Sequence, residues 1–480
     1  MQQDHTVTVE EAVQVLAMVG DLSMGQSTDQ SLRTAVLAER LARADGAEDP
    51  ACAHVRLVSL LRWSGCTANA SGFSTLLGDD VGGRNAMLAD TLPAGSRPAF
   101  TSVAQLAQIH CEVSGAIAQA MNLPAEVDIA LRRVWEHFDG GGMPEGVHDA
   151  QIPCLVYYTN LASDLDILTR AHGLEEGLRM IALRADKKYP AALVRLLAAN
   201  ARAWLEATDA PSCAAEIAAL AERVSLTIVA DMIELKLPWL LGYSRRVADL
   251  AERAAQLAGL TPAQQRCMGR AALIHGIGRA AVPNALWQRR GKLGAADWEK
   301  VRLVPYWTAR AGIQIPSLRA EATLASHVYE RLDGSGYYRD LDAESLAMPQ
   351  RILSAAAAYA ALRMPRPWRG ACTAPEAAQC LAADAAAGCF DEHAVNVVLA
   401  AAQGAGAAPV QPGAQRRSLL SERETAVLRR LSLGESNKEV ARELQISPST
   451  VGTHVESIFR KLGCSTRTAA TLKGLTLGLI

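Results

Sequence analysis

Close to the carboxy-terminal end of the chain, polar and apolar side chains recur with the period of one helix. The apolar residues stand at i, i+4, i+7 and i+11, so they form a narrow buried stripe and leave the opposite face to solvent. The apolar set is Val451, Val455, Ile458 and Leu462. The outward set is Thr450, Gly452, Thr453, Glu456, Ser457 and Arg460. Hydroxyl, carboxylate and guanidinium groups on one helix face bond to base edges and phosphates, so this face predicts contact with nucleic acid.

Helix-start signals place another short helix directly ahead of this one. Ser436-Asn437-Lys438-Glu439 has the form of a capping box, as does Ser421–Glu424 before it, while Ser447 and Pro448 have the form of an N-cap and N1. The middle helix is expected to stop at Ile446. Its buried side is expected to hold Val440, Ala441 and Leu444. Two short helices joined by a tight turn predict a helix-turn-helix unit, whose second helix enters the major groove while Lys438 faces phosphates.

This segment also resembles a known family. The runs L-x-E-R-E-x-x-V-L, G-x-S-N-K-E-V-A-x-x-L-x-I-S-x-x-T-V-x-x-H-V, K-L-G and S-x-R, between Leu419 and Ala470, are similar to the LuxR-type helix-turn-helix domain. The resemblance implies a four-helix domain that binds double-stranded promoter DNA and often forms a homodimer through its last helix, here Thr466 to Leu477. It assigns the DNA contacts to Asn437, Lys438, Ser447, Thr450, Gly452, Thr453, His454, Glu456, Ser457 and Arg460. Many members carry basic residues at the positions of Gly452 and Glu456, so the base preference stays open.

The charge balance fits a local rather than a global DNA-binding surface. The whole chain has 48 basic and 50 acidic residues, a net charge of −2. From Arg416 onward eleven basic residues stand against six acidic ones, a net charge of +5, so the preceding part carries −7. A small helical interaction module with solvated charges is the alternative interpretation of this end of the chain.

The rest of the chain is predicted to be mainly helical and internally repeated. Ala38–Ala42 resembles Ala251–Ala255, and Leu60–Gly65 resembles Leu273–Gly278, both at the same offset along the chain. Glu136–Gly142 resembles Glu330–Gly336 at a somewhat shorter offset. These matches predict two copies of one helical domain. The expected domains are 1–205 and 206–400, followed by a Gly/Pro-rich linker at 401–417 and the helix-turn-helix domain at 418–480.

The second copy resembles the HD-GYP branch of the HD-domain phosphohydrolases, on the segments Leu273–Arg279, Val282–Asn284 and Glu330–Tyr337. In that family a His-Asp doublet with further His and Asp residues holds two or three metal ions that activate water against a phosphodiester, often cyclic di-GMP. The family's ligand positions fall on Tyr243, His275-Gly276, Val304, Val328-Tyr329 and Ala357. Only His275 remains a ligand type, so the resemblance implies a fold without its binuclear site.

The first copy has lost the same residue types, with Gln30 at the leading position and Arg62-Trp63 at the doublet. His110, Glu136–Asp139 and Asp164 are interpreted as ordinary helix-end and surface residues rather than as a metal cluster. A remnant ligand pocket in the second copy is assigned to His275, Arg279, His327 and Asp333. We therefore expect two degenerate HD-like bundles with no catalytic residues, no metal and no cofactor.

Three classes of function stay open at this point. The first is a DNA-binding regulator whose helical region is an inactive module, either for sensing a small-molecule or protein signal or for dimerisation. The second is an HD-GYP-type cyclic di-GMP phosphodiesterase, and the third is a helical interaction scaffold. The amino terminus lacks a secretory pattern, the ten cysteines form no C-x-x-C pair, and no membrane partner is indicated, so a cytoplasmic protein is expected.

Overall fold

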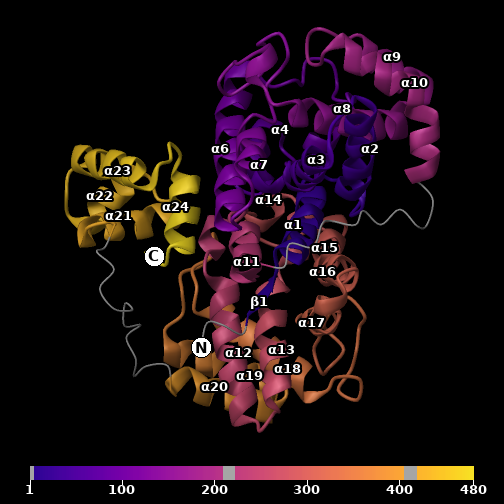
Figure 1. Ribbon diagram of the computed structural model, residues 1–480. Helices are drawn as coiled ribbons and strands as arrows, with labels where there is room; N and C mark the ends of the chain where they lie inside the picture. Colours follow the sequence, from indigo (N-terminus) through magenta and orange to yellow (C-terminus); the bar gives the residue numbers. More distant parts are fainter. Residues whose placement is uncertain (1–4, 209–221, 405–418) are drawn as a thin grey trace. The chain divides into compact units, whose positions relative to one another are not determined.

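The computed structural model describes residues 5–208, 222–404 and 419–480, and it is built almost entirely of helices (Figure 1). A two-stranded sheet pairs β1 (Thr6–Thr8) with β2 (Arg223–Ser225). The prediction of a mainly helical fold is confirmed. Within the described ranges, no helix has both the length and the apolar character required to cross a membrane.

The chain divides into two compact units, and the division between them falls at Val224/Ser225 rather than at the predicted 205/206. The unit formed mainly by Thr8–Val224 carries the first copy. Its helices are α1 (Val9–Ser23), α2 (Gln30–Ala44), α3 (Asp49–Leu61), α4 (Ala70–Leu77), α5 (Gly82–Leu88), α6 (Phe100–Ala120), α7 (Ala125–Arg132), α8 (Cys154–His172), α9 (Leu174–Ala182) and α10 (Ala191–Thr208). Two short 3₁₀ helices, η1 (Ser64–Cys66) and η2 (Asp149–Gln151), complete it.

The other unit, formed mainly by Ser225–Gly463, carries the second copy. Its helices are α11 (Thr227–Glu234), α12 (Tyr243–Leu257), α13 (Pro262–Ile274), α14 (Asn284–Trp287), α15 (Ala295–Arg302), α16 (Val304–Ile313), α17 (Arg319–Ala325), α18 (Met348–Leu362), α19 (Ala374–Ala386) and α20 (Glu392–Gly404). Its 3₁₀ helices are η3 (Pro238–Leu240), η4 (Ile277–Ala281) and η5 (Pro316–Leu318).

The sequence repeat coincides with a structural repeat. The offset from α2 to α12 equals the offset from α3 to α13 at both ends of each helix, and it is the offset of the first two sequence matches. The starts of α8 and α18 differ by the offset of the third match. Single hydrogen bonds repeat as well: the Glu136 carboxylate accepts from the Glu145 amide at 2.7 Å, and the Glu330 carboxylate accepts from the Arg339 amide at 2.9 Å. The two copies therefore share one helical framework.

A close backbone approach also recurs in both copies. A side chain at Gly65 would collide with the His110 carbonyl oxygen, and one at Gly278 would collide with the Val304 carbonyl oxygen. Glycine is required at both positions because only hydrogen fits between these backbones. His110 thus occupies in the first copy the place that Val304 occupies in the second.

Local signals account well for α12 and α13. Val247, Leu250, Ala251 and Ala254 of α12 are buried, as the 3.6-residue period predicts. Gly259 takes a positive φ of 73° after the helix, and Thr261 caps α13 in a capping box with Gln264. Leu257, in the last turn of α12, has an exposure of 57% although it falls at the same helical spacing.

Two predicted boundaries differ from the observed helices. The division between 205 and 206 falls inside α10, which continues to Thr208 because no glycine or proline interrupts it before that residue. The predicted linker at 401–417 starts too early, since residues 401–404 belong to α20. Residues 405–417 lie outside the described residues.

The carboxy-terminal domain contains α21 (Glu422–Ser432), α22 (Asn437–Leu444), α23 (Pro448–Leu462) and α24 (Arg467–Thr476). The capping boxes at Ser421 and Ser436 are both formed, and Ser447 caps α23. Helix α22 ends two residues before the predicted Ile446, because Gln445 adopts a left-handed conformation with φ of 53°. Only Val440 and Ala441 of its expected buried residues are fully buried. The order and caps of the helix-turn-helix unit are as predicted.

Candidate functional site

Helix α23 presents the polar face that the sequence predicted. Its four stripe residues are all buried, and they fix the rotation of the helix about its axis. The residues that are exposed on the opposite side are Thr450, Thr453, Glu456 and Arg460. A Cβ atom at Gly452 would meet no other atom within 4 Å, so this part of the face is open. An exposed helix of this kind can lie in a major groove with its side chains against base edges.

Two residues of the predicted DNA-contact set are engaged inside the domain instead. The Ser447 hydroxyl accepts from the Thr450 amide at 3.0 Å, which makes it the N-cap of α23. The Ser457 hydroxyl donates to the Glu424 carboxylate at 2.7 Å, and Ser457 is only partly exposed. Lys438 is exposed at the start of α22, whereas Asn437 and His454 are partly exposed. The face available to a base edge is therefore narrower than the sequence suggested.

Glu424 links α21 to α23 and was missed as an anchor by sequence reasoning. Its carboxylate accepts from the Ser421 amide at 2.7 Å and from the Lys461 ammonium at 2.6 Å, in addition to Ser457. Burial raises its pKa, but the bonds from Lys461, Ser421 and Ser457 outweigh burial and lower the pKa to about 2. The capping box signalled only the bond within α21; the bonds to α23 join residues that lie far apart in the sequence.

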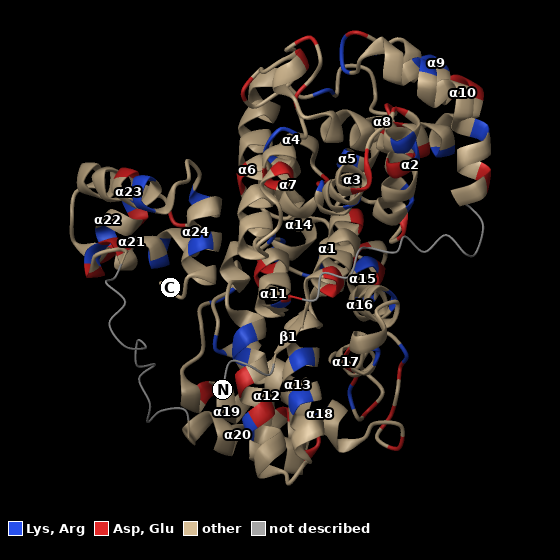
Figure 2. Ribbon diagram, viewed as in Figure 1, with Lys and Arg blue, Asp and Glu red and all other residues tan. Residues whose placement is uncertain are grey.

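Charges of both signs lie on the carboxy-terminal domain. Figure 2 shows Lys and Arg together with Asp and Glu on α21, α22 and α23 rather than a continuous basic stripe. Several acidic groups are held by bases, since Arg430 pairs with Glu435 at 2.7 Å and with Glu443 at 3.1 Å. Lys438 and Arg460 are exposed, so these individual cations can contact a phosphate backbone.

In the second copy, several positions that the resemblance assigned to metal ligands converge around one arginine. The Tyr243 hydroxyl donates to the Ala357 carbonyl oxygen at 3.0 Å, and the rings of Tyr243 and His275 lie 5.3 Å apart. The Arg279 guanidinium lies 3.2 Å from His275 Nε2 and donates to the Tyr329 hydroxyl at 2.7 Å. It also lies over the Tyr243 ring, 5.0 Å from its centroid. The register assigned from the sequence therefore brings together the expected residues.

Arg279 gives this cluster a permanent positive charge. His275 is fully buried, and burial together with the charge of Arg279 lowers its pKa to about 3, so the imidazole is neutral. Burial lowers the pKa of Arg279, but Tyr329, Tyr243 and Glu234 raise it further, so Arg279 stays protonated. A fixed positive charge with one neutral imidazole and two phenols is an unfavourable donor set for paired divalent ions. The residues present do not fit the metal centre.

The remnant pocket assigned from the sequence is wrong in two of its four residues. His275 and Arg279 lie together, but the His327 imidazole bonds to the Thr323 carbonyl oxygen at 2.6 Å and lines a separate small cavity beside Glu330. Asp333 stabilises its own exposed loop by accepting from the Ser335 amide at 3.1 Å. Tyr329, at a position that the resemblance assigned to a metal ligand, lies in the turn after α17 and accepts a hydrogen bond from Arg279.

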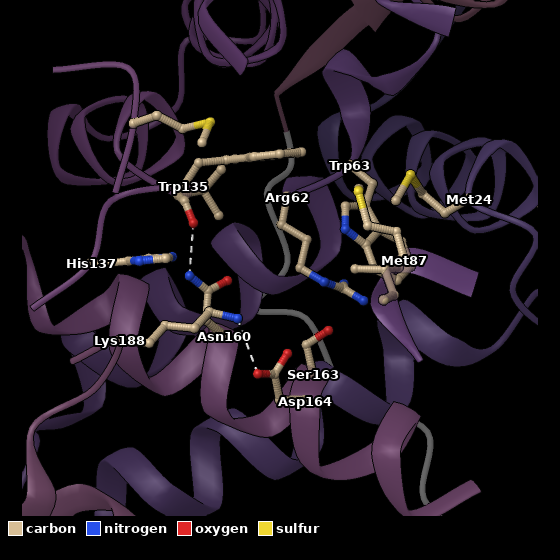
Figure 3. A pocket seen from close by; sticks show the side chains of 13 residues that line it. Met24, Arg62, Trp63, Met87, Trp135, His137, Asn160, Ser163, Asp164 and Lys188 are labelled. Atoms are coloured by element: carbon tan, nitrogen blue, oxygen red, sulfur yellow. Dashed lines mark hydrogen bonds and ion pairs between the residues drawn. The ribbon is translucent and has the colours of Figure 1, made fainter. Parts of the chain in front are cut away.

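In the first copy an arginine, Arg62, stands at the position that corresponds to His275. Arg62 is buried, donates to the Gln30 side chain and to the Ser31 hydroxyl, the latter at 3.0 Å, and lies 3.7 Å from the centroid of the Trp63 ring (Figure 3). Burial raises the pKa of neighbouring Asp21 to about 7, against the lowering effects of Arg62 and Ser31. Both copies thus hold a guanidinium at or beside the positions that the sequence resemblance assigned to metal ligands.

The sequence interpreted the remaining polar residues of the first copy as helix-end and surface residues, but His110, Glu136 and Asp164 are buried. Glu136 binds the Glu145 amide, His110 is buried with its ring 5.6 Å from that of Trp135, and Asp164 accepts from Arg184 at 2.5 Å. Asp139 accepts from the Gly141 amide at 2.8 Å. Across residues 5–208, 222–404 and 419–480, no three His, Cys, Asp or Glu side chains are grouped to hold a metal ion.

Comparisons with known proteins match both parts of the chain. Residues 227–393 match the model of the HD domain, and residues 418–473 match the model of bacterial regulatory proteins of the luxR family. The chain is 27% identical over 281 residues to 3'3'-cGAMP-specific phosphodiesterase 3 of Vibrio cholerae, covering 56% of this chain and 61% of that protein. The probable transcriptional regulatory protein NarL of Mycobacterium tuberculosis is 43% identical over 74 residues, 15% of this chain and 32% of NarL. In each case the matched part is less than two thirds of the relative.

A solved structure supports the fold of the helical region. The crystal structure of a cyclic GMP-AMP specific phosphodiesterase of Vibrio cholerae superposes with a TM-score of 0.60 and 21% identity, covering 83% of this chain and 98% of that structure. At this identity the likeness concerns the fold. Together with the family matches it shows that the chain combines a helical region containing an HD domain with a carboxy-terminal helix-turn-helix domain of the luxR family.

Proposed function

We propose that this chain is a transcriptional regulator that binds double-stranded promoter DNA and whose HD-like region is catalytically inactive. The observation that carries the DNA-binding part is the exposed face of α23, with Thr453 and Arg460 held outward by a buried apolar stripe. NarL, a probable transcriptional regulatory protein, is similar over the same segment. Contact with chromosomal DNA places the proposed regulator in the cytoplasm, and recognition of paired half-sites favours a homodimer.

The inactivity of the HD-like region rests on the charge at its centre. A divalent ion placed near His275 would face the Arg279 guanidinium, which is hydrogen-bonded and stacked in place. Arg62 presents the same obstacle in the first copy. Like charges within a few ångströms of one another in a buried site repel strongly, so the guanidinium and the ion exclude each other.

The alternative is a phosphodiesterase, which the resemblance to the Vibrio cholerae enzyme favours. We expect the purified full chain, after dialysis against Mn²⁺, to retain no stoichiometric metal and to leave 3',3'-cyclic GMP-AMP and cyclic di-GMP intact. Elemental analysis and chromatography of the nucleotides measure both. The matched control is His275→Ala: turnover that persists in this variant is contamination. Two bound ions per chain, with hydrolysis that His275→Ala abolishes, would establish the enzyme and overturn the inactive assignment.

A further inference from the structure

The glycine at position 452 of α23 is not required by the fold of the carboxy-terminal domain. It lies inside the helix and does not take a positive φ, and a Cβ atom added there would meet no atom of the described residues within 4 Å. Glycine stabilises a helix interior less than alanine does, so Gly452 weakens α23 without improving its packing. The space in front of Gly452 is therefore open to a molecule outside the domain, which can approach the helix backbone closely.

Glu456 is a second residue of this face that the domain does not use for its own stability. Its side chain is exposed one helical turn after Gly452. Glu424 pairs with Lys461, whereas no cation in the described part of the chain forms an ion pair with Glu456. A negative charge on a DNA-binding face weakens attraction to phosphates, so Glu456 does not increase general affinity for DNA. Its carboxylate is instead available as a hydrogen-bond acceptor for one particular partner.

The positions of these residues along α23 place them where base edges are contacted. In helix-turn-helix proteins the N-terminal part of the second helix contacts the bases. Gly452, Thr453 and Glu456 share one face, because residues three and four apart are neighbours on a helix. A base pair that comes close at Gly452 is therefore within reach of the Glu456 carboxylate, which is about 6 Å further along the helix axis. Arg460, one more turn away, can contact a phosphate through its longer side chain.

A carboxylate distinguishes among the four bases in the major groove. An ionised carboxylate accepts hydrogen bonds and donates none. Guanine presents the acceptors N7 and O6 and thymine presents the acceptor O4, so both repel it. Adenine offers its N6–H donor beside the acceptor N7, whereas cytosine offers the N4–H donor without an acceptor of its own. Cytosine is therefore the base that a carboxylate favours.

We propose that Glu456 selects a C·G base pair of the bound DNA by accepting a hydrogen bond from cytosine N4, and that Gly452 lets this base pair approach α23 closely. The inference rests on the proposed DNA-binding function and adds the base that this face recognises. Any other base leaves the carboxylate without water and without a sufficient donor, so binding to the wrong sequence is penalised. Glu456 thus determines specificity, while exposed cations such as Arg460 contribute affinity.

Selection of duplexes from a random DNA pool by the full chain, followed by fluorescence titration, tests the base preference. The selected sites are expected to share a cytosine at one position, and replacing that C·G pair by A·T should weaken binding at least about fivefold. In Glu456→Ala, the affinities for the four base pairs at this position should lie within about twofold of one another. In Glu456→Gln the preference should change to adenine, because an amide side chain bonds to adenine N6 and N7.

The matched control is Glu422→Gln. Glu422 is exposed in the first turn of α21, so its substitution removes the same charge outside α23 and should keep the cytosine preference. Sequence-specific binding without a shared cytosine, or an identical preference in Glu456→Gln, would overturn this proposal and leave DNA binding standing. Absence of DNA binding by the full chain would overturn both this proposal and the proposed function.

Replacing Gly452 by alanine tests the close approach. Alanine favours the helix, so weaker binding by this variant cannot come from unfolding of α23. Affinity for the selected duplex is expected to fall about fivefold, while affinity for unrelated DNA, which depends on phosphate contacts, should be unchanged. Equal affinity of the variant and the unsubstituted protein for the selected duplex would contradict the role given to Gly452.

Discussion

Replacing Thr453 and Arg460 together by alanine is expected to weaken DNA binding by the full chain about 100-fold. Both side chains are exposed on α23, and each contact with a base or phosphate contributes roughly 1–3 kcal/mol. Sites selected from a random DNA pool provide the duplex, and a fluorescence titration at several salt concentrations measures affinity. If Arg460 contacts a phosphate, its loss also reduces the salt dependence, by about one unit of slope.

The control for this pair is Arg429→Ala. Arg429 is exposed on α21, and its substitution removes the same charge from the domain without touching the α23 face. Affinity should change little, because a single distant charge is screened at moderate salt. Equal losses in the control and the double variant would mean that general charge, and not the α23 face, governs binding. Undiminished binding by a folded double variant would remove α23 from the interface.

Replacing Glu424 by glutamine is expected to destabilise the carboxy-terminal domain by about 2 kcal/mol. The substitution removes the charge that holds Lys461, and bonds to charged groups contribute roughly 1.5–3 kcal/mol. Because the full chain has several domains, one unfolding temperature does not report on this domain alone. Hydrogen exchange of the α21 and α23 amides measures it directly. Glu456→Gln, which neutralises an exposed carboxylate on α23, should leave exchange unchanged.

The same carboxylate predicts a pH dependence. Its folded-state pKa of about 2 lies below the unfolded value of roughly 4.3, so its stabilisation is present above the unfolded pKa. The contribution is lost as the pH falls through the folded pKa of about 2. Once the observed rates are corrected for intrinsic exchange, the protection of the α21 and α23 amides should therefore fall with acid more steeply in the unsubstituted protein than in Glu424→Gln. Parallel profiles for the two proteins would contradict the role given to Glu424.

In the helix-turn-helix domain, the features that depend on local sequence were predicted correctly. The boxes at Ser421 and Ser436 and the cap at Ser447 form as predicted, because each depends on groups within one helical turn. The stripe from Val451 to Leu462 is buried as its helical period predicts, and this too is a local property. Ser457 was assigned to the DNA contacts, but its hydroxyl bonds to Glu424. Ser457 lies at the edge of the polar face, where it is within reach of α21. The remaining contacts to DNA stay predictions.

The sequence predicted the helical repeat of the HD-like region but not the contacts around Arg279. Corresponding helices of the two copies start at the offsets that the sequence matches predicted, so the alignment of the repeats was correct. The loss of most HD ligand types stays a prediction. The sequence did not predict that Arg279 lies between His275 and Tyr329. Tyr329 is remote from Arg279 in the sequence, so no local pattern relates the two residues.

The amino-acid sequence was sufficient for the helical class, the repeat and the caps of the carboxy-terminal domain. The helical class and the caps follow from periodicity and from bonds within one helical turn, and these do not depend on distant segments of the chain. Three other features came from tertiary packing: guanidinium groups lie at or beside positions that the resemblance assigned to metal ligands in both copies, Glu424 joins two helices, and Trp135, Arg62 and Lys188 line one cavity (Figure 3). Close packing of separate helices selects these neighbours, and such packing leaves no periodic signal in the chain.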